Sequence, residues 1–481
     1  MADFIIPYWV RQHATKSARG MGMRVLMFGA VKDWLYRGNM AGCSSCPSLE
    51  KVACIGLMTT NLESSGSVLR RIRLVSSLGI VLDGYNLSVI AVALVPLTRF
   101  YRLTAGQTGL LASAMLLGSI GGGLAAGVLA DWLGRKRLLL WDLVIFMVFS
   151  LLSAVLNSYM WLVVARFIVG LAVGADYAIS PTYLAEFAPA KTRGFHMGYI
   201  WLAWSVGAVV SFGLGVMVVD WLPNAWSWRV LFGLATVPAA VALGIRRVLP
   251  ESLHWLQDRH GTSRIGGKKI PEVVPMRRWL LATIPWFLMD FSTYGLGLLL
   301  PLFLKSNGLT SITGAIVGTG VAALSGGIGS AWAMFQLDRT GRIGLQMRGF
   351  FLSGIGLMGL AVALWLNVRV FALLLGGLMV VNLLNGSGPG TTCGIIPAEI
   401  FPTRIRATAL GISTAFSRIG AITGVFVLGF AEVRWGLGAV LAIAGAAALL
   451  GAGLTALWRV EPNQAPLPTS TDVLTPPNVL N

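Results

Sequence analysis

Charged side chains are scarce in this sequence. Of its 481 residues, 12% are Asp, Glu, Lys or Arg and 56% are hydrophobic, and the mean hydropathy is +0.75. Soluble domains usually carry about 25% charged residues, so this composition excludes an ordinary soluble protein and places most of the chain in lipid. At about 20 residues for each membrane helix, the length fits roughly a dozen spans.

Cysteine and histidine are also rare, with four of each. Cys43 and Cys46 form a CxxC, but no second cysteine pair or histidine follows at the spacing of a metal site. We interpret these two, Cys54 and Cys393 as incidental thiols; the alternative is a metal or redox site at the CxxC. A membrane enzyme is the least favoured class, because the sequence has no metal-ligand cluster and no nucleophile–base motif, and no prosthetic group is implied.

Apolar runs dominate the rest and fall into two sets of six. They cover residues 74–97, 108–130, 138–157, 160–183, 195–219, 227–248, 279–303, 310–336, 347–366, 369–396, 407–431 and 435–458. We therefore predict an all-α membrane protein with 12 transmembrane helices in two six-helix halves, residues 69–248 and 279–460, joined by a cytoplasmic loop at 249–278. Residues 1–68 are expected to be a disordered cytoplasmic extension or an overlong start, and the Pro-rich residues 461–481 a disordered tail.

Lysine and arginine set the expected orientation. If the segment before the first helix is cytoplasmic, the inner segments from residue 70 onward hold 22 of these residues and the outer segments hold 6. The positive-inside rule then places both termini in the cytoplasm. The same distribution explains the net charge of +18 without a nucleic-acid partner.

The two sets of helices repeat each other's motifs. "EFAPAKTR" (186–193) and "EIFPTRIR" (399–406) share E-x-x-P-x-x-x-R at an offset of 213, and Asp131 and Asp338 begin matching D-x-x-G-R motifs at an offset of 207. Asp83 and Asp290 are also 207 residues apart. Three matches in order indicate a duplicated unit, which suits a transporter whose binding site lies between the halves.

These motifs resemble those of the major facilitator superfamily. "GVLADWLGRKR" (127–137) is similar to the loop after the second helix of that family, and "PESLHWL" (250–256) and "PAEIFPTRIRATALGIS" (397–413) are similar to its sugar-porter and phosphate:proton-symporter branches. The resemblance covers residues from about 70 to 460 and implies a transporter working by alternating access, with protons as coupling ion and no cofactor.

Charges repeated at the inner ends of the helices suggest a cytoplasmic gate. An aspartate there can accept from a helix N-terminus or an arginine, Gly134 permits a tight turn, and Arg135 can pair with Glu186. We expect Glu186 with Arg193, and Glu399 with Arg406, to form matching clusters in the two halves. The alternative is that these residues only set topology and turns. The predicted gate residues are Asp131, Gly134, Arg135, Glu186, Arg193, Asp338, Glu399 and Arg406.

Charges inside the spans point to a transport path, because such groups are costly in lipid. Asp83 lies about 13 Å from the inner edge at 1.5 Å per residue, and Arg166 about 9 Å below the outer edge. The resemblance implies that the aspartate of the first helix and the arginine of the fourth act together in proton coupling. We predict that role for Asp83, Arg166 and Asp290; the alternative is a permanent structural ion pair between Asp83 and Arg166.

A substrate site is predicted on three helices, 160–183, 279–303 and 407–431. Trp286, Asp290 and Tyr294 are spaced i, i+4, i+8 and can line one face of a helix. Resemblance to the phosphate symporters adds Asp176 and Tyr177, and Arg418 could clamp an oxyanion or neutralise Asp176 or Asp290.

The sequence departs from each branch. Trp204 or Ala208 stands where phosphate symporters have glutamine, Gly390 stands where they have asparagine, and Asn86 replaces a second acid. We predict a proton symporter for a small polar metabolite, an organic acid or phosphate-like anion, with sugar as a further possibility. The alternatives are an efflux antiporter or facilitator, and a nutrient sensor. A monomer in the plasma membrane is expected, with the lipid bilayer and a small molecule as its partners.

Overall fold

The computed structural model describes residues 66–468, apart from Val248, Leu253, Arg369 and the segments 257–263, 266–267, 270–273 and 307–311. Residues 1–65, with Cys43, Cys46 and Cys54, and residues 469–481 lie outside this part. The disorder predicted for those two segments therefore stays a prediction.

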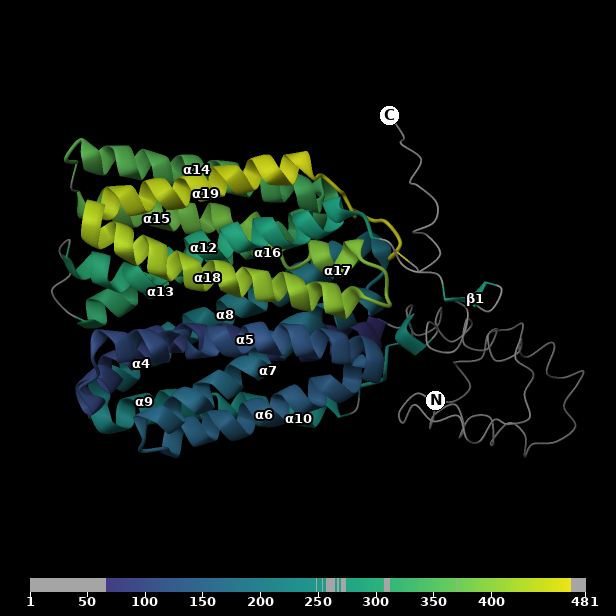
Figure 1. Cartoon of the computed structure of the whole chain (residues 1–481), viewed down its shortest axis with the longest axis horizontal. Coiled ribbons are helices and arrows are strands. Elements are labelled where there is room, and N and C mark those ends of the chain that lie inside the picture. Colours follow the sequence, from purple (N-terminus) through teal and green to yellow (C-terminus); the bar gives the residue numbers. More distant parts are fainter. Residues whose placement is uncertain are drawn as a thin grey trace, which may run out of the picture.

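Long helices make up nearly all of the described chain (Figure 1). The first half consists of α4 (Gly66–Tyr101), α5 (Ala105–Leu133), α6 (Arg135–Val155), α7 (Tyr159–Phe187), the 3-10 turn η2 (Ala190–Thr192), α8 (Arg193–Trp221), α9 (Asn224–Leu234) and α10 (Thr236–Arg246). A ribbon of two short strands, β1 (Arg264–Ile265) and β2 (Lys268–Lys269), lies in the central loop. The second half consists of α12 (Met276–Ser306), α13 (Ile312–Thr340), α14 (Arg342–Trp365), α15 (Phe371–Gly386), α16 (Pro389–Thr392), α17 (Ile396–Ile400), α18 (Arg406–Trp435) and α19 (Leu437–Leu457).

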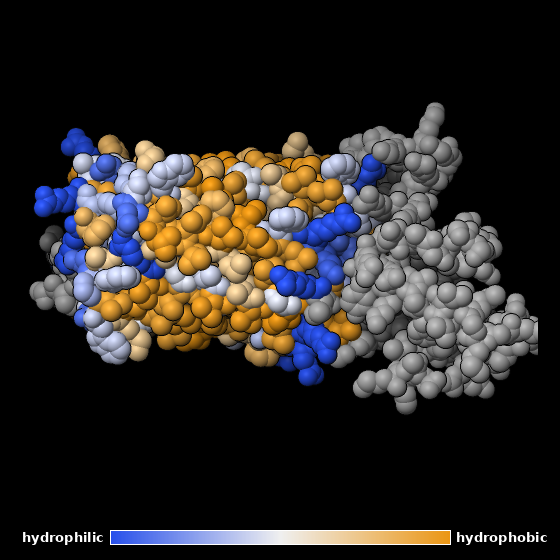
Figure 2. All heavy atoms as spheres, turned by 90° about the horizontal axis from the view of Figure 1, so that it is seen from below, coloured by the Kyte–Doolittle hydropathy of each residue, from blue (hydrophilic) through white to orange (hydrophobic). Residues whose placement is uncertain are grey.

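Eleven segments of the described residues are long and apolar enough to cross a membrane, and α12, with 31 residues, is a further long helix. A helix satisfies its own backbone hydrogen bonds, which lipid cannot do. Figure 2 shows the result on one face, a broad apolar belt with polar residues gathered toward both ends. The predicted fold class is confirmed, and each predicted span lies at its expected place in the chain.

Small residues bring the two halves together along α5 and α18, which lie side by side in Figure 1. A Cβ placed on Gly411 of α18 would lie 2.2 Å from the carbonyl oxygen of Gly123 on α5, so the two backbones are almost in contact there. Helices in membranes associate through such close approaches, because lipid tails give no hydrophobic drive between helices. The second crossing between the halves joins α8 and α13.

The segment after α19 packs against the bundle, so the predicted disorder is wrong for residues 461–468. Glu461 accepts from the backbone N–H groups of Arg342 (2.9 Å) and Ile343 (3.0 Å), and Leu467 is buried. The carbonyl oxygens of Ala465 and Pro468 accept from Arg193 and Arg406. The prolines suggested disorder, but here they hold an extended segment whose polar groups find partners on the helix ends.

Candidate substrate site and gate

Two aspartates tie the halves together at the end of the bundle predicted to be cytoplasmic. Asp131, on α5, accepts from the backbone N–H and the hydroxyl of Thr408 (both 2.7 Å) at the start of α18 in the other half. Asp338, on α13, accepts from the N–H groups of Gly194 and Phe195 (both 2.8 Å) at the start of α8. Each carboxylate therefore caps the N-terminus of a helix in the opposite half, where the helix dipole favours negative charge.

Two arginines donate hydrogen bonds within the same network. Arg135 donates to Asp131 (2.9 Å), to Glu186 (3.3 Å) and across the interface to the carbonyl oxygen of Thr403 (2.8 Å). Glu186 also accepts from Arg406 of the other half at 2.8 Å. Gly134 has φ +105°, the left-handed region that glycine adopts most easily, as the predicted tight turn requires.

The predicted pairing of glutamates with arginines is wrong in two respects. Glu186 pairs with Arg406 rather than Arg193, and Glu399 pairs with Arg342 through two contacts of 2.8 Å. Arg193 donates to the carbonyl oxygen of Ala465. The cause is the contact of α18 with α7, which brings Arg406 onto Glu186. The repeat offset of 207 from Arg135 could have identified Arg342 from the sequence.

Two further glutamates cap helices in this region and were missed as site residues. Glu251 accepts from the N–H groups of Arg135 (3.0 Å) and Lys136 (3.2 Å) at the start of α6, as Glu461 does at the start of α14. Burial raises the pKa of the Glu251 carboxyl above its ordinary value, against the effect of the hydrogen bonds that it accepts. We call the cross-half contacts of Asp131, Arg135, Glu186, Asp338 and Arg406 the gate network.

A cavity of about 240 Å³ lies between the halves. Its walls come from α4, α7 and α8 on one side and from α12 to α16, α18 and α19 on the other. Trp286, Asp290 and Tyr294, which were predicted to share one face of a helix, all line the cavity from α12. Tyr177 and Arg418 line it too.

Arg418 is the cationic centre of this cavity and is 1% exposed. Its Nη1 donates to the carboxylate of Asp290 (3.1 Å) and to the hydroxyl of Tyr294 (2.9 Å), and its guanidinium carbon lies 4.5 Å from the ring centre of Tyr177. Nε and Nη2 of Arg418 are buried and have no hydrogen-bond partner among the described residues. The contact with Asp290 is one of the two pairings foreseen for this arginine; the one with Asp176 is not formed.

The predicted pair of Asp83 and Arg166 is not formed. Arg166 donates to the side-chain oxygen (3.0 Å) and carbonyl oxygen (3.1 Å) of Asn86, and it lies 4.4 Å from the ring centre of Phe232. Asn86 lies about 4.5 Å further along the helix axis than Asp83, and so closer to the depth of Arg166. Asp83 is 2% exposed, and its Oδ2 has no hydrogen-bond partner among the described residues.

Asp176 does not line the cavity, which corrects its predicted place in the substrate site. Both oxygens of Asp176 accept from Nη2 of Arg246 (2.9 and 3.1 Å), whose Nη1 donates to Asp142 at 3.1 Å. All three residues are buried. Arg246 is the last residue of α10, so the sequence places it at the edge of the membrane. Asp142 and Asp176, two acids within predicted spans, were the signal that a buried cation lies near them.

Side chains that the sequence did not single out complete the cavity wall. Asn382 and Asn385 line it from α15, and Trp201 lines it from α8. The amide nitrogens of the two asparagines donate to Leu378 (2.9 Å) and Thr293 (3.2 Å). Periodicity on α8 and α15 could not select these residues, because both helices are apolar on nearly all faces.

The family of the chain follows from its similarity to known proteins. Residues 72–269 and 276–465 match the family described as sugar (and other) transporter. The chain belongs to this family. It is a transporter and not an enzyme, and it has the fold of the major facilitator superfamily.

Curated relatives and solved structures agree with this assignment. The chain is 29% identical over 423 residues to the putative metabolite transport protein YaaU of Escherichia coli (strain K12), covering 81% of this chain and 90% of that one. It is 27% identical over 407 residues to the cis,cis-muconate transport protein of Acinetobacter baylyi, covering 81% and 94%. The fold is similar to that of the proton:xylose symporter XylE, with a TM-score of 0.74 at 22% identity and coverage of 85% and 99%.

Proposed function

We propose that the protein carries a small organic anion across the membrane together with protons, by alternating access of the cavity between the halves. The observation that carries this proposal concerns the guanidinium of Arg418 in that cavity. Its Nη1 has hydrogen-bond partners, whereas Nε and Nη2 have none among the described residues. A closed gate network at one end of the bundle and a duplicated fold support alternating access.

Arg418 favours an anionic substrate. Its Nη1 is occupied by Asp290 and Tyr294, while Nε and Nη2 are buried donors without partners among the described residues. Leaving such donors unpaired is costly, and a carboxylate can satisfy two of them at once. Relatives named for cis,cis-muconate and sialic acid transport are consistent with an acid as substrate.

Three hydroxyl groups of the cavity wall disfavour a sugar. Those of Ser292 and Ser353 donate to the carbonyl oxygens of Ala444 (3.1 Å) and Gly349 (2.7 Å), and that of Thr319 donates to Ala315 (2.8 Å). A sugar needs side chains that both donate to and accept from its many hydroxyl groups, whereas these donors are already used within the protein. We therefore infer an organic acid rather than a sugar, although the family model and XylE carry sugar names.

Asp290 supplies a physical basis for coupling. Its carboxylate and the substrate compete for the same arginine, Arg418. When Asp290 takes a proton it loses its charge and its hold on Arg418 weakens, so that the arginine can bind the anion. A proton and an anion then enter the cavity together, which is the sign of coupling that symport requires. Arg166, which is bonded to Asn86, is left with a structural role in this scheme.

Uptake by proteoliposomes tests the proposal. With an inward proton gradient, we expect accumulation of one of a panel of benzoate, cis,cis-muconate, phosphate and xylose, with an acid preferred. Replacing Arg418 with glutamine should reduce that uptake at least about tenfold, since a hydrogen bond to a charged group contributes about 1.5–3 kcal/mol. Arg434→Gln, at an exposed position of the same helix, is the matched control and should transport normally. Accumulation of xylose alone, or unchanged uptake by Arg418→Gln, would contradict the proposal.

A further inference from the structure

We propose that Trp201 closes the cavity toward the predicted cytoplasmic end by seating its indole ring in a notch at Gly394, and that the same ring contacts the transported molecule. The inference rests on the proposed function only in taking the cavity between the halves as the substrate site.

The notch is formed by the missing side chain of Gly394. A Cβ on this residue would lie 1.8 Å from Cζ2 of Trp201 and 2.6 Å from Cε2, so the seated ring leaves no room for even a methyl group. Gly394 lies between α16 and α17 in the second half, and Trp201 lies on α8 in the first half. The contact therefore joins the two halves, and they cannot separate here while the ring is seated.

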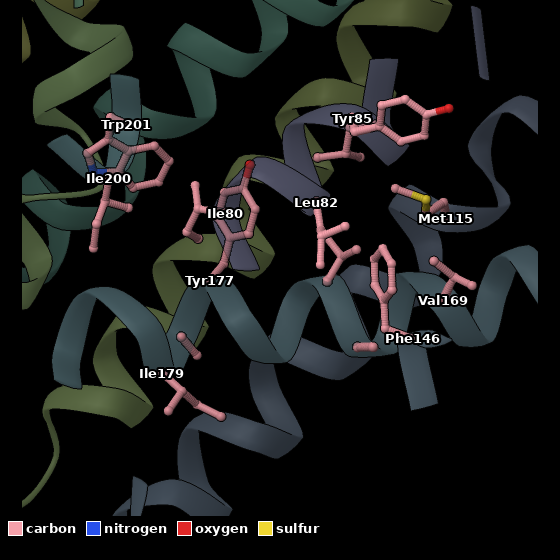
Figure 3. Packing of buried hydrophobic residues seen from close by; sticks show 14 of the residues in the cluster. Ile80, Leu82, Tyr85, Met115, Phe146, Val169, Tyr177, Ile179, Ile200 and Trp201 are labelled. Atoms are coloured by element: carbon pink, nitrogen blue, oxygen red, sulfur yellow. The ribbon is translucent and has the colours of Figure 1, made fainter. Parts of the chain in front are cut away.

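Trp201 also faces the cavity between the halves. Trp201 lines it, and its ring packs edge-on against Tyr177 (5.6 Å between ring centres) and Trp286 (5.9 Å). Figure 3 shows Trp201 beside Tyr177, which reaches it from α7. Tyr177 in turn carries Arg418 over its ring at 4.5 Å. A molecule bound at Arg418 thus lies against the aromatic cluster that holds Trp201.

The position of Trp201 along α8 sets the direction in which it closes. The helix begins at Arg193, where Asp338 caps the N–H groups of Gly194 and Phe195. Seven residues of helix, about 10 Å, separate Gly194 from Trp201. The ring therefore lies between the gate network and the cavity, as an inner layer of the same barrier.

Trp201 is held in its seat by packing alone. Its Nε1 is buried and has no hydrogen-bond partner among the described residues. An unpaired buried donor costs free energy that is recovered when the ring moves to a place where the N–H finds a partner. A residue that must leave its seat in every transport cycle suits such a weakly held state.

Cys393 gives a direct test, because this buried thiol is the neighbour of Gly394. With Cys43, Cys46 and Cys54 replaced by serine, it is the only cysteine, and its reaction with N-ethylmaleimide reports loosening of the packing around Gly394. We expect Gly394→Ala to react about tenfold faster than the parent, because the added methyl group displaces the ring. Gly376→Ala is the matched control, since a Cβ there meets nothing within 4 Å.

A second substitution separates displacement of Trp201 from general damage. Phenylalanine is smaller than tryptophan, so Trp201→Phe should leave room for the methyl group. The double variant Trp201→Phe/Gly394→Ala should then react more slowly than Gly394→Ala alone, a non-additive effect that only contacting residues show. If Gly394→Ala does not fold, Trp201→Ala alone should raise the rate of Cys393 labelling.

Two results would overturn the inference. One is labelling of Gly394→Ala, or of Trp201→Ala, at the parent rate; the other is a double variant that reacts as fast as Gly394→Ala. The labelling needs neither substrate nor a proton gradient. A failure of anion uptake would therefore contradict the proposed function and leave the gating role of Trp201 standing. Labelling results that contradict the gating role would likewise leave the proposed function standing.

Discussion

Asp83 is the buried carboxylate whose surroundings differ most from expectation. It is 2% exposed, its Oδ2 has no hydrogen-bond partner among the described residues, and the arginine predicted to neutralise it is bonded to Asn86. A charged group without a partner is unfavourable in a dry site, so Asp83 gains from taking a proton when the site is closed. This favours proton transfer over a permanent ion pair.

Replacing Asp83 with asparagine should separate transport from coupling. We expect accumulation driven by a proton gradient to fall, because one of the two coupling carboxylates, Asp83 and Asp290, is lost. Exchange of labelled for unlabelled substrate across proteoliposomes should continue, because the cavity does not include Asp83. Glu432→Gln, at the end of α18 opposite the gate network, is the control and should keep both activities. Normal accumulation by Asp83→Asn would remove this residue from the coupling mechanism.

Contacts between residues were predictable where the residues lie close together along one helix or turn. Arg135 lies one turn from Asp131, and the i, i+4, i+8 spacing on α12 placed Trp286, Asp290 and Tyr294 on one face of the cavity. Partners across helices depend on depth and rotation, which a single sequence does not specify. Asn86 lies about one helical turn from Asp83, and this difference in depth was enough for Arg166 to bond to Asn86 instead of Asp83.

At the scale of elements, helix positions followed hydropathy, because the thickness of the bilayer sets the length of each apolar run. Breaks within a run were harder to foresee. The predicted tenth span, 369–396, contains α15, α16 and the start of α17. The break lies at Gly388 and Pro389, where the proline has no backbone N–H to continue the helix. A Cβ on Gly388 would be 2.5 Å from Cα of Gly349, so a tertiary contact also requires glycine there.

The caps that cross between the halves are the elements most open to a direct test. Asp131→Asn and Asp338→Asn each remove a negative charge from a helix N-terminus in the other half. Each should weaken the closed state by about 1 kcal/mol, the usual worth of a helix cap. The measurement is the distance between spin labels at the exposed positions Arg137 and Thr340, one in each half.

Both single variants should shift this distance distribution to longer values, and the double variant should shift it further, because the two caps sit on different helices. Glu432→Gln, at the opposite end of α18, should leave the distribution unchanged. The cross-half caps would have no gating role if neither aspartate variant differed from that control.

Across the whole molecule, the segment after α19 contacts arginines of both halves, and one of them, Arg406, belongs to the gate network. Arg193 of the first half and Arg406 of the second both donate to this segment, through Ala465 (2.8 Å) and Pro468 (3.4 Å). Gln464 donates to the carbonyl oxygen of Asp338 at 2.8 Å, and the side chain of Leu467 is buried. The segment therefore spans the interface that must open when the cavity turns to the predicted cytoplasmic side.

Ending the chain after Glu461 should remove these contacts while keeping the cap of α14. We expect the distance between labels at Arg137 and Thr340 to lengthen and the exchange of substrate to speed up, because the closed state loses its bridge between the halves. Ending the chain after Pro468 keeps every described contact of the segment and should behave as the full chain does. Equal distance distributions for the two truncated chains would show that the gate network and Trp201 alone hold the halves together. The segment after α19 would then pack on the second half without stabilising the closed state.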